Sequence, residues 1–81
     1  MDYFFMNECI FKIIVKNNKS FIIELLKSIN IYIEDYELFD IYEEEKTKLD
    51  ILLFTNNLVI NIELNKNKNT TYQLKITIRG N

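Results

Sequence analysis

The sequence contains no proline, histidine, tryptophan or alanine, and only one glycine and one cysteine. Without histidine, the chain lacks the side chain that most often transfers protons in enzymes near neutral pH. Cys9 has no histidine to form a nucleophilic or zinc-binding pair and no second cysteine for a disulfide, so we expect it to be a small buried apolar residue. Gly80 alone cannot make a phosphate-binding loop. These absences predict a protein that is not an enzyme and holds no cofactor.

Long hydrophobic runs are also missing, since the longest is four residues and a membrane-spanning helix needs roughly 18. Residues 1–8 lack the basic start and long apolar stretch of a secretory signal peptide. We therefore expect a cytoplasmic protein that does not enter a membrane. The 81 residues are 48% hydrophobic and 27% charged, which predicts a single folded domain over residues 1–81.

The first third of the chain shows two different periodicities. Residues 9–16 alternate in the manner of a strand, which Tyr3–Met6 could extend. After a polar break, Ser20 is a candidate N-cap, and the apolar residues of 21–29 fall on one helical stripe. Asn30 tolerates a left-handed backbone and is expected to end this helix after about three turns.

The last part of the chain predicts an antiparallel meander. Residues 48–54 read as a strand, Asn56–Asn57 as a tight turn, and residues 58–64 as a second alternating strand. A polar loop then leads to a final strand over residues 72–78, with Tyr72, Leu74, Ile76 and Ile78 facing inward.

The predicted fold is therefore of the α+β class, with one short helix packed on a mainly antiparallel sheet of about five strands in the order β-α-β-β-β-β. One helix about 10–12 Å wide cannot cover a sheet about 24 Å wide. The opposite face of the sheet would also carry apolar side chains, and an exposed patch of that kind is typical of an interface. We therefore expect a homodimer with an interface formed by Ile10, Ile14, Leu52, Phe54 and Val59.

Residues 31–45 hold seven acids, three tyrosines and one phenylalanine, with no lysine or arginine. The segment carries a charge of −7, whereas residues 1–30 sum to +1 and residues 46–81 to +4. Glu34–Asp35 and Phe39–Asp40 break strict alternation, so we expect a bulged or twisted strand that ends near Glu43. A calcium-binding EF-hand loop starting at Asp35 fails, because Lys46 stands where the bidentate glutamate is required. No metal site is predicted.

This acidic segment has two interpretations. It is either a charged edge strand that resists aggregation or a binding surface, in which tyrosines supply contact area and carboxylates attract a basic partner. In the second interpretation Tyr36 and Tyr42 are the anchors. The full predicted contact set is Glu34, Asp35, Tyr36, Glu37, Asp40, Tyr42, Glu43, Glu44 and Glu45.

The resulting function hypothesis is a small non-enzymatic binding protein that occludes a basic protein partner through residues 31–45. Inhibitors of this kind from phages or mobile elements fill the nucleic-acid groove of a host enzyme, and nine lysines against one arginine suit an AT-rich genome. One alternative is a structural or adaptor homodimer. Another is a weak single-stranded nucleic-acid binder that uses the C-terminal cations, disfavoured because no aromatic platform accompanies them. These cations are Lys66, Lys68, Lys75 and Arg79.

Overall fold

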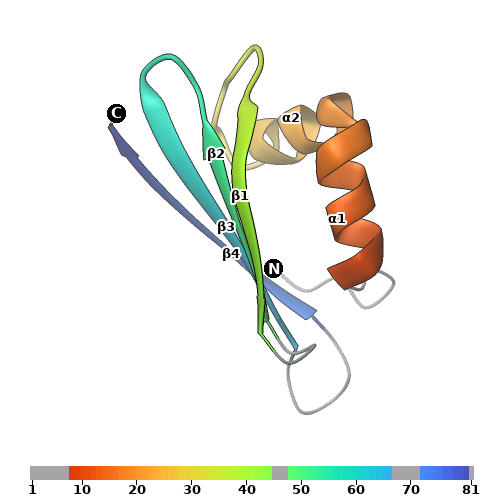
Figure 1. Cartoon of the computed structure of the whole chain (residues 1–81). Helices are drawn as coiled ribbons and strands as arrows, with labels where there is room; N and C mark the ends of the chain where they lie inside the picture. The colour runs from red at the N-terminus through yellow and green to blue at the C-terminus, as the bar shows by residue number, and fades with distance from the viewer. Residues whose placement is uncertain (1–7, 45–47, 67–71, 81) are drawn as a thin grey trace.

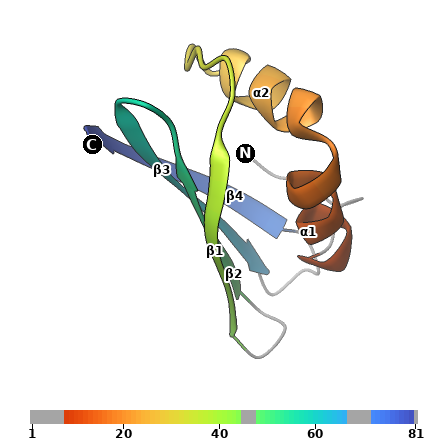
Figure 2. The ribbon, with the colours of Figure 1, turned by 45° about the horizontal axis from the view of Figure 1, so that its top comes forward.

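The computed structural model describes residues 8–44, 48–66 and 72–80. Within them, two helices, α1 (Glu8–Asn17) and α2 (Lys19–Lys27), precede four strands, β1 (Glu37–Glu44), β2 (Lys48–Phe54), β3 (Leu58–Lys66) and β4 (Tyr72–Gly80). The strands form one antiparallel sheet in the order β1-β2-β3-β4. Both helices lie on the same side of this sheet (Figures 1 and 2). The α+β class is confirmed, with two helices and four strands in place of one helix and about five strands.

The largest correction concerns residues 9–16, which form α1 and not a strand. Phe11 and Val15, four residues apart, are buried at 0% and 1% exposure, whereas Ile13 is 60% exposed. That spacing belongs to one face of a helix. Lys12 and Lys16 are also four residues apart, so their positions fit a helix face as well as a strand face. The predicted strand at Tyr3–Met6 lies outside the described residues.

The second helix forms much as expected, but it starts earlier. Asn18 is its N-cap, and the Asn18 Oδ1 atom accepts hydrogen bonds from the Phe21 backbone N–H at 3.2 Å and from the Ser20 hydroxyl at 2.8 Å. Ser20 therefore supports the cap and is not the cap itself. Asn30 takes the predicted left-handed conformation, with φ of 66°, and redirects the chain toward the sheet.

The meander formed by β2, β3 and β4 confirms the sequence prediction. Strand β2 spans the predicted residues, and the turn after it is closed by the Thr55 N–H, which donates to the Leu58 carbonyl at 2.9 Å. The side chains of β2 and β3 that face the helices are buried, as strict alternation requires. They are Leu49, Ile51, Leu53, Ile60, Ile62 and Leu64.

The hydrophobic core lies between these strands and the helices. Ile22, Leu25 and Leu26 of α2 join Phe11 and Val15 of α1 against the inner face of the sheet. Four strands span roughly 19 Å, and two helices about 10–12 Å wide can cover that width. The shortage of cover that we inferred for one helix is thus met by the second helix. Neither described helix has the length and apolar character needed to cross a bilayer.

The outer face of the sheet, opposite the helices, is not covered by any described element. Leu52, Phe54 and Val59 point to this face, because each alternates with a buried inner residue, but only Leu52 and Phe54 are partly exposed, and Val59 is 7% exposed. Ile10 and Ile14, which we had assigned to the same face, belong to α1 on the other side of the sheet. Their predicted placement was wrong because residues 9–16 form a helix.

Candidate protein-binding site

Strand β1 is an edge strand of the sheet and contains no cation. Its ladder with β2 shifts register between Leu38 and Asp40, which confirms the predicted bulge. The bulge leaves Phe39 as the extra residue, so that Phe39 and Asp40 both lie on the outer face. We call the exposed outer residues of β1 the acidic–aromatic strip, and they are Glu37, Phe39, Asp40, Tyr42 and Glu44.

The aromatic part of this strip is built on β2. The Phe39 ring stacks on the Phe54 ring, with centroids 4.5 Å apart and an interplanar angle of 16°. Phe39 nevertheless remains 63% exposed and Tyr42 58% exposed. The sequence analysis did not include Phe39 in the contact set. The available signal was the break in alternation at residues 39 and 40, which predicts a bulge and therefore an unusual side-chain direction.

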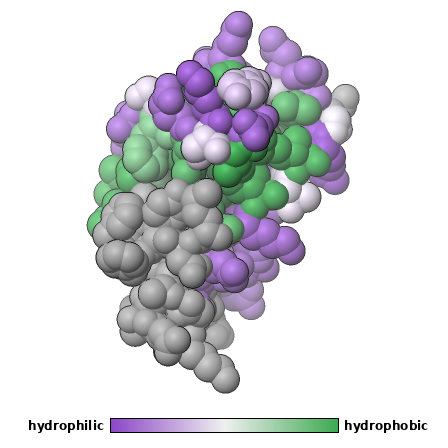
Figure 3. Space-filling model, turned by 180° about the vertical axis from the view of Figure 1, so that it is seen from behind, coloured by the Kyte–Doolittle hydropathy of each residue, from purple (hydrophilic) through white to green (hydrophobic). Residues whose placement is uncertain are grey.

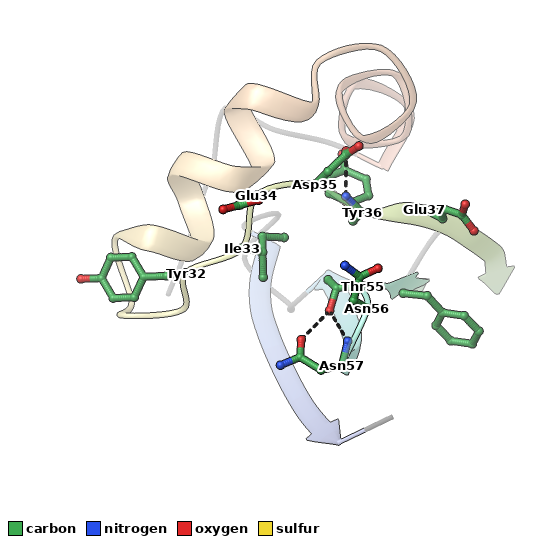
Figure 4. Close-up of a pocket in the computed structure, with 10 residues that line it drawn as sticks. Tyr32, Ile33, Glu34, Asp35, Tyr36, Glu37, Thr55, Asn56 and Asn57 are labelled. Atoms are coloured by element: carbon green, nitrogen blue, oxygen red, sulfur yellow. Dashed lines mark hydrogen bonds between the residues drawn. The ribbon is translucent and has the colours of Figure 1, made fainter.

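A surface hollow of about 510 Å³ adjoins the strip at the end of the sheet. It lies between residues 32–37 and the turn of residues 54–57, and Figure 4 shows its lining. Three carboxylates, Glu34, Asp35 and Glu37, line it together with Tyr32, which is 69% exposed. Glu37 and Phe54 belong to both the hollow and the outer face, so the two features form one continuous surface.

Opposite the carboxylates, the turn is held by its own hydrogen bonds. The Thr55 hydroxyl oxygen accepts from the Leu58 backbone N–H at 3.0 Å and from the Asn57 backbone N–H at 3.4 Å. The same hydroxyl donates to Asn57 Oδ1 at 3.3 Å (Figure 4). Asn56 completes this wall, so the hollow is bounded by amide groups on one side and carboxylates on the other.

Asp35 has an internal role at the rim of the hollow. Its Oδ1 atom accepts hydrogen bonds from the Lys19 ammonium at 3.0 Å and from the Tyr36 backbone N–H at 2.8 Å. The Lys19 hydrogen bond, followed by that backbone N–H, holds the pKa of Asp35 below its ordinary value. Lys19 also donates to the Tyr36 carbonyl at 2.8 Å, so the first turn of α2 is tied to the start of β1.

Tyr36 is a core residue, which corrects its predicted role as a surface anchor. Its side chain is 2% exposed, and its hydroxyl donates to the Val15 carbonyl at 2.9 Å. That carbonyl lies near the end of α1, where helix carbonyls lack intrahelical partners. Burial, and then the negative charge of Asp35, raise the pKa of Tyr36 to about 12. The residue holds α1 against the strands and cannot reach a partner.

Two further members of the predicted set do not join the strip. Glu43 is paired in register with inner Leu49 and forms an ion pair with Lys12 of α1. It therefore points toward the helical side of the sheet. Glu45 lies outside the described residues. The structure thus places Glu37, Asp40, Tyr42 and Glu44 on the strip and Glu34 near it, and adds the exposed rings of Tyr32 and Phe39. Asp35 and Glu43 are also exposed, but each forms an ion pair with a lysine of a helix.

At the other end of the outer face, the charged side chains form ion pairs with one another. The Lys48 ammonium lies 3.0 Å from Glu63 Oε1 and 3.4 Å from Asp50 Oδ2. The hydrogen bond to Glu63, and then the charge of Asp50, raise the pKa of Lys48, while the pKa of Glu63 is lowered mainly by Lys48. The charges at this end satisfy one another, whereas Glu37 has no ion pair among the described residues.

Within residues 8–44, 48–66 and 72–80, no three potential ligands among histidine, cysteine, aspartate and glutamate gather where they could hold a metal ion. What the surface offers is a set of exposed rings with carboxylates at their margin. A cationic side chain can stack on such rings while its charge is paired.

Comparison of the chain with protein-family models, with curated proteins and with solved structures finds no match in any of the three.

Proposed function

We propose that the protein is a non-enzymatic binding module that occludes a basic surface of a protein partner with the acidic–aromatic strip and the adjoining hollow. The observation that carries this proposal is the exposure of Tyr32, Phe39 and Tyr42, at 69%, 63% and 58%. Exposed aromatic rings are enriched at the centres of protein interfaces, because they bury a large area with little loss of side-chain entropy. Here all three stand in the segment that has no cation.

Electrostatics favour a basic partner. Glu37, Asp40 and Glu44 lie along one strand, so the potential over the strip is negative and would steer a cationic surface toward it. The stacked rings of Phe39 and Phe54 give a flat platform beside Glu37. An arginine guanidinium suits this combination because it stacks on an aromatic face and pairs with a carboxylate at the same time.

Affinity capture followed by measurement of binding tests the proposal. The wild-type protein, Glu37→Lys and the matched control Glu24→Lys, an exposed acid of α2, are used to isolate proteins from cells in which the chain is expressed. A captured protein is purified, and its affinity for all three variants is measured. We expect Glu37→Lys to weaken binding by about tenfold or more, Glu24→Lys to leave it unchanged, and added salt to weaken it.

A comparison of the two affinities can contradict the proposal. Equal affinities for Glu37→Lys and Glu24→Lys, with unfolding transitions like that of the wild type, would show that the strip is not the binding surface. A Phe39→Ala variant separates the two contributions, because it removes a ring and keeps every charge. We expect the complex with Phe39→Ala to dissociate faster than the wild-type complex, while the salt dependence of its association rate changes little.

A homodimer is the second candidate, and a specific observation favours it. Leu52 and Phe54 are partly exposed on the outer face of the sheet, and the exposed ring of Phe39 extends the same patch, whereas Val59 is only 7% exposed. A second copy could bury this patch. Light scattering at about 100 μM tests it, since a stable dimer of ordinary affinity is populated there. A species of 9.8 kDa contradicts the dimer, and a dimer should be lost in Phe54→Glu but kept in the α1 control Ile13→Glu.

We do not propose nucleic-acid binding. The exposed rings Phe39 and Tyr42 lie on β1 among carboxylates and Tyr32 precedes that strand, whereas Lys75 and Arg79 lie on β4 at the other edge of the sheet. A strand whose bases stacked on Phe39 would bring its phosphates to Glu37 and Asp40, which repel them.

A further inference from the structure

The second edge of the sheet differs from the first. Strand β4 pairs with β3 over nine consecutive positions without a register shift, and it has no other strand neighbour among the described residues. It contains no proline and no acid. Native sheets protect their edges with bulges, prolines, inward-pointing charges or other charged side chains, lysine above all. Strand β1 has a bulge and Glu43 on its inner side, whereas the charges of β4 are the cations Lys75 and Arg79 on its outward face.

The outward side chains of β4 are basic or neutral. They alternate as Gln73, Lys75, Thr77 and Arg79, and all four are exposed. Arg79 stands opposite Val59 in the ladder and has no ion pair among the described residues. A shallow groove lined in part by Thr77 and Arg79 runs beside it on the outer face.

The inward side chains of β4 are apolar and incompletely covered. Leu74 is 7% exposed, whereas Ile76 and Ile78 pack against the core but keep part of their surface open. Seen from behind, apolar atoms gather across the middle of the described surface, below a polar rim (Figure 3). A strand added to β4 could therefore bury its apolar side chains on the inner face of the sheet. Its other side chains would lie on the outer face, next to the cations of β4.

We propose that β4 is an acceptor edge for an extended peptide in which apolar residues alternate with acidic ones. The N–H and C=O groups of β4 that point away from β3 would form the ladder, as in other cases of strand addition. The apolar side chains of the peptide would lie beside Ile76 and Ile78, and its carboxylates beside Lys75 and Arg79. Opposite charges across neighbouring strands stabilise such a pair.

Charge selects this occupant over a second copy of β4. Antiparallel self-pairing centred on Thr77 would set Lys75 directly against Arg79 of the other copy, which is destabilising. Centring on Ile76 avoids that clash but still brings four cations together with no acid in either strand. Strand β1 of a second copy carries acids, but its bulge interrupts a regular ladder.

The test uses a synthetic nine-residue peptide in which valine alternates with glutamate, capped at both ends. One control replaces glutamate with lysine, and another carries N-methyl groups on alternate backbone nitrogens. We expect the acidic peptide to shift the backbone amide NMR signals of β4 and to protect them from hydrogen exchange, and both controls to bind at least about tenfold more weakly.

Variants of β4 test whether the peptide binds at this edge of the sheet. Reversing Lys75 and Arg79 to glutamate should lower affinity for the acidic peptide by about tenfold and raise it for the lysine peptide. Reversing Lys16 and Lys27, exposed on the helices, should change neither. No binding at about 1 mM, equal binding of all peptides, or a β4-dependent dimer without peptide would overturn the proposal. Glu37→Lys should bind the peptide normally, so this inference and the proposed function fail separately.

Discussion

Replacing Tyr36 with phenylalanine should remove one hydrogen bond and keep the buried ring. The lost bond joins the Tyr36 hydroxyl to the Val15 carbonyl at 2.9 Å, and its removal leaves that carbonyl without this partner inside the protein. A buried polar group left without a partner costs about 1–2 kcal/mol. We therefore expect the free energy of unfolding of Tyr36→Phe near neutral pH to fall by about that amount.

At high pH the same hydroxyl should destabilise the folded wild type relative to Tyr36→Phe. Burial raises the pKa of Tyr36 in the folded protein from 10.0 to about 12. Below pH 10 both states keep the proton, so the folded protein has its full stability. Between pH 10 and pH 12 the unfolded chain loses the proton more readily, and a shift of this size removes roughly 2–3 kcal/mol. Phenylalanine cannot titrate, so the variant escapes this loss.

Urea unfolding, followed by circular dichroism, measures both effects. The wild type should be more stable than Tyr36→Phe at about pH 7, and the difference should shrink and reverse as the pH approaches 12. Lysines and the other tyrosines titrate in both proteins and cancel in the difference. Tyr42→Phe, which removes an exposed hydroxyl, should leave the neutral-pH midpoint unchanged. Parallel pH curves for wild type and Tyr36→Phe would refute the assignment of this hydroxyl to a buried bond.

Two further predictions concern the backbone and the polar end of the outer face. Asn30 has φ of 66°, so Asn30→Val should destabilise by about 1–2 kcal/mol, and Asn30→Gly should change stability by less than about 0.5 kcal/mol. Equal urea midpoints for the two variants would contradict a left-handed requirement. The pKa of Glu63 is lowered mainly by its hydrogen bond from Lys48, so its stabilising contribution is complete above pH 4.5 and is lost as pH falls through the lower, folded value. Glu63→Gln should flatten the acid side of the stability profile, and an unchanged acid slope would count against this pair.

The sequence predicted the meander well because its strands face two different environments. In β2 and β3 the inner positions are apolar and buried, while the outer face includes Asp50, Asn61 and Glu63. A one-residue slip would bury these polar groups, so the register is strongly determined. The bulge at Phe39 was also predictable, because the alternation of β1 fails at that residue.

The sequence could not assign α1, for a physical reason. Residues 9–16 place apolar side chains in every phase, so strand and helix patterns both fit. Their β-branched residues favour a strand only when a neighbouring strand is available to pair with them. In the folded chain the inner face of the sheet needs a second covering element, and Phe11 and Val15 supply it. Tertiary packing therefore decided the conformation.

The tyrosines of the acidic segment show the same limit. Tyr36 and Tyr42 have similar neighbours in sequence, yet one is 2% exposed and the other 58%. Tyr36 belongs to the core cluster, and its hydroxyl donates a hydrogen bond to the carbonyl of Val15, 21 residues earlier in the chain. No local pattern reveals a contact at that separation.

Edge protection and partner recognition, the two interpretations of the acidic segment, are compatible in this sheet. Acids along β1 oppose pairing with β1 of another copy, and cations along β4 oppose pairing with another β4. The remaining combination, β1 with β4, has complementary charge, but the bulge at Phe39 breaks the ladder that it would need. Like charges therefore disfavour pairing of β1 with another β1 and of β4 with another β4, while each strand still attracts a strand of opposite charge. In the two binding modes that we propose, the side chains that oppose self-pairing would also select a basic partner at β1 and an acidic strand at β4.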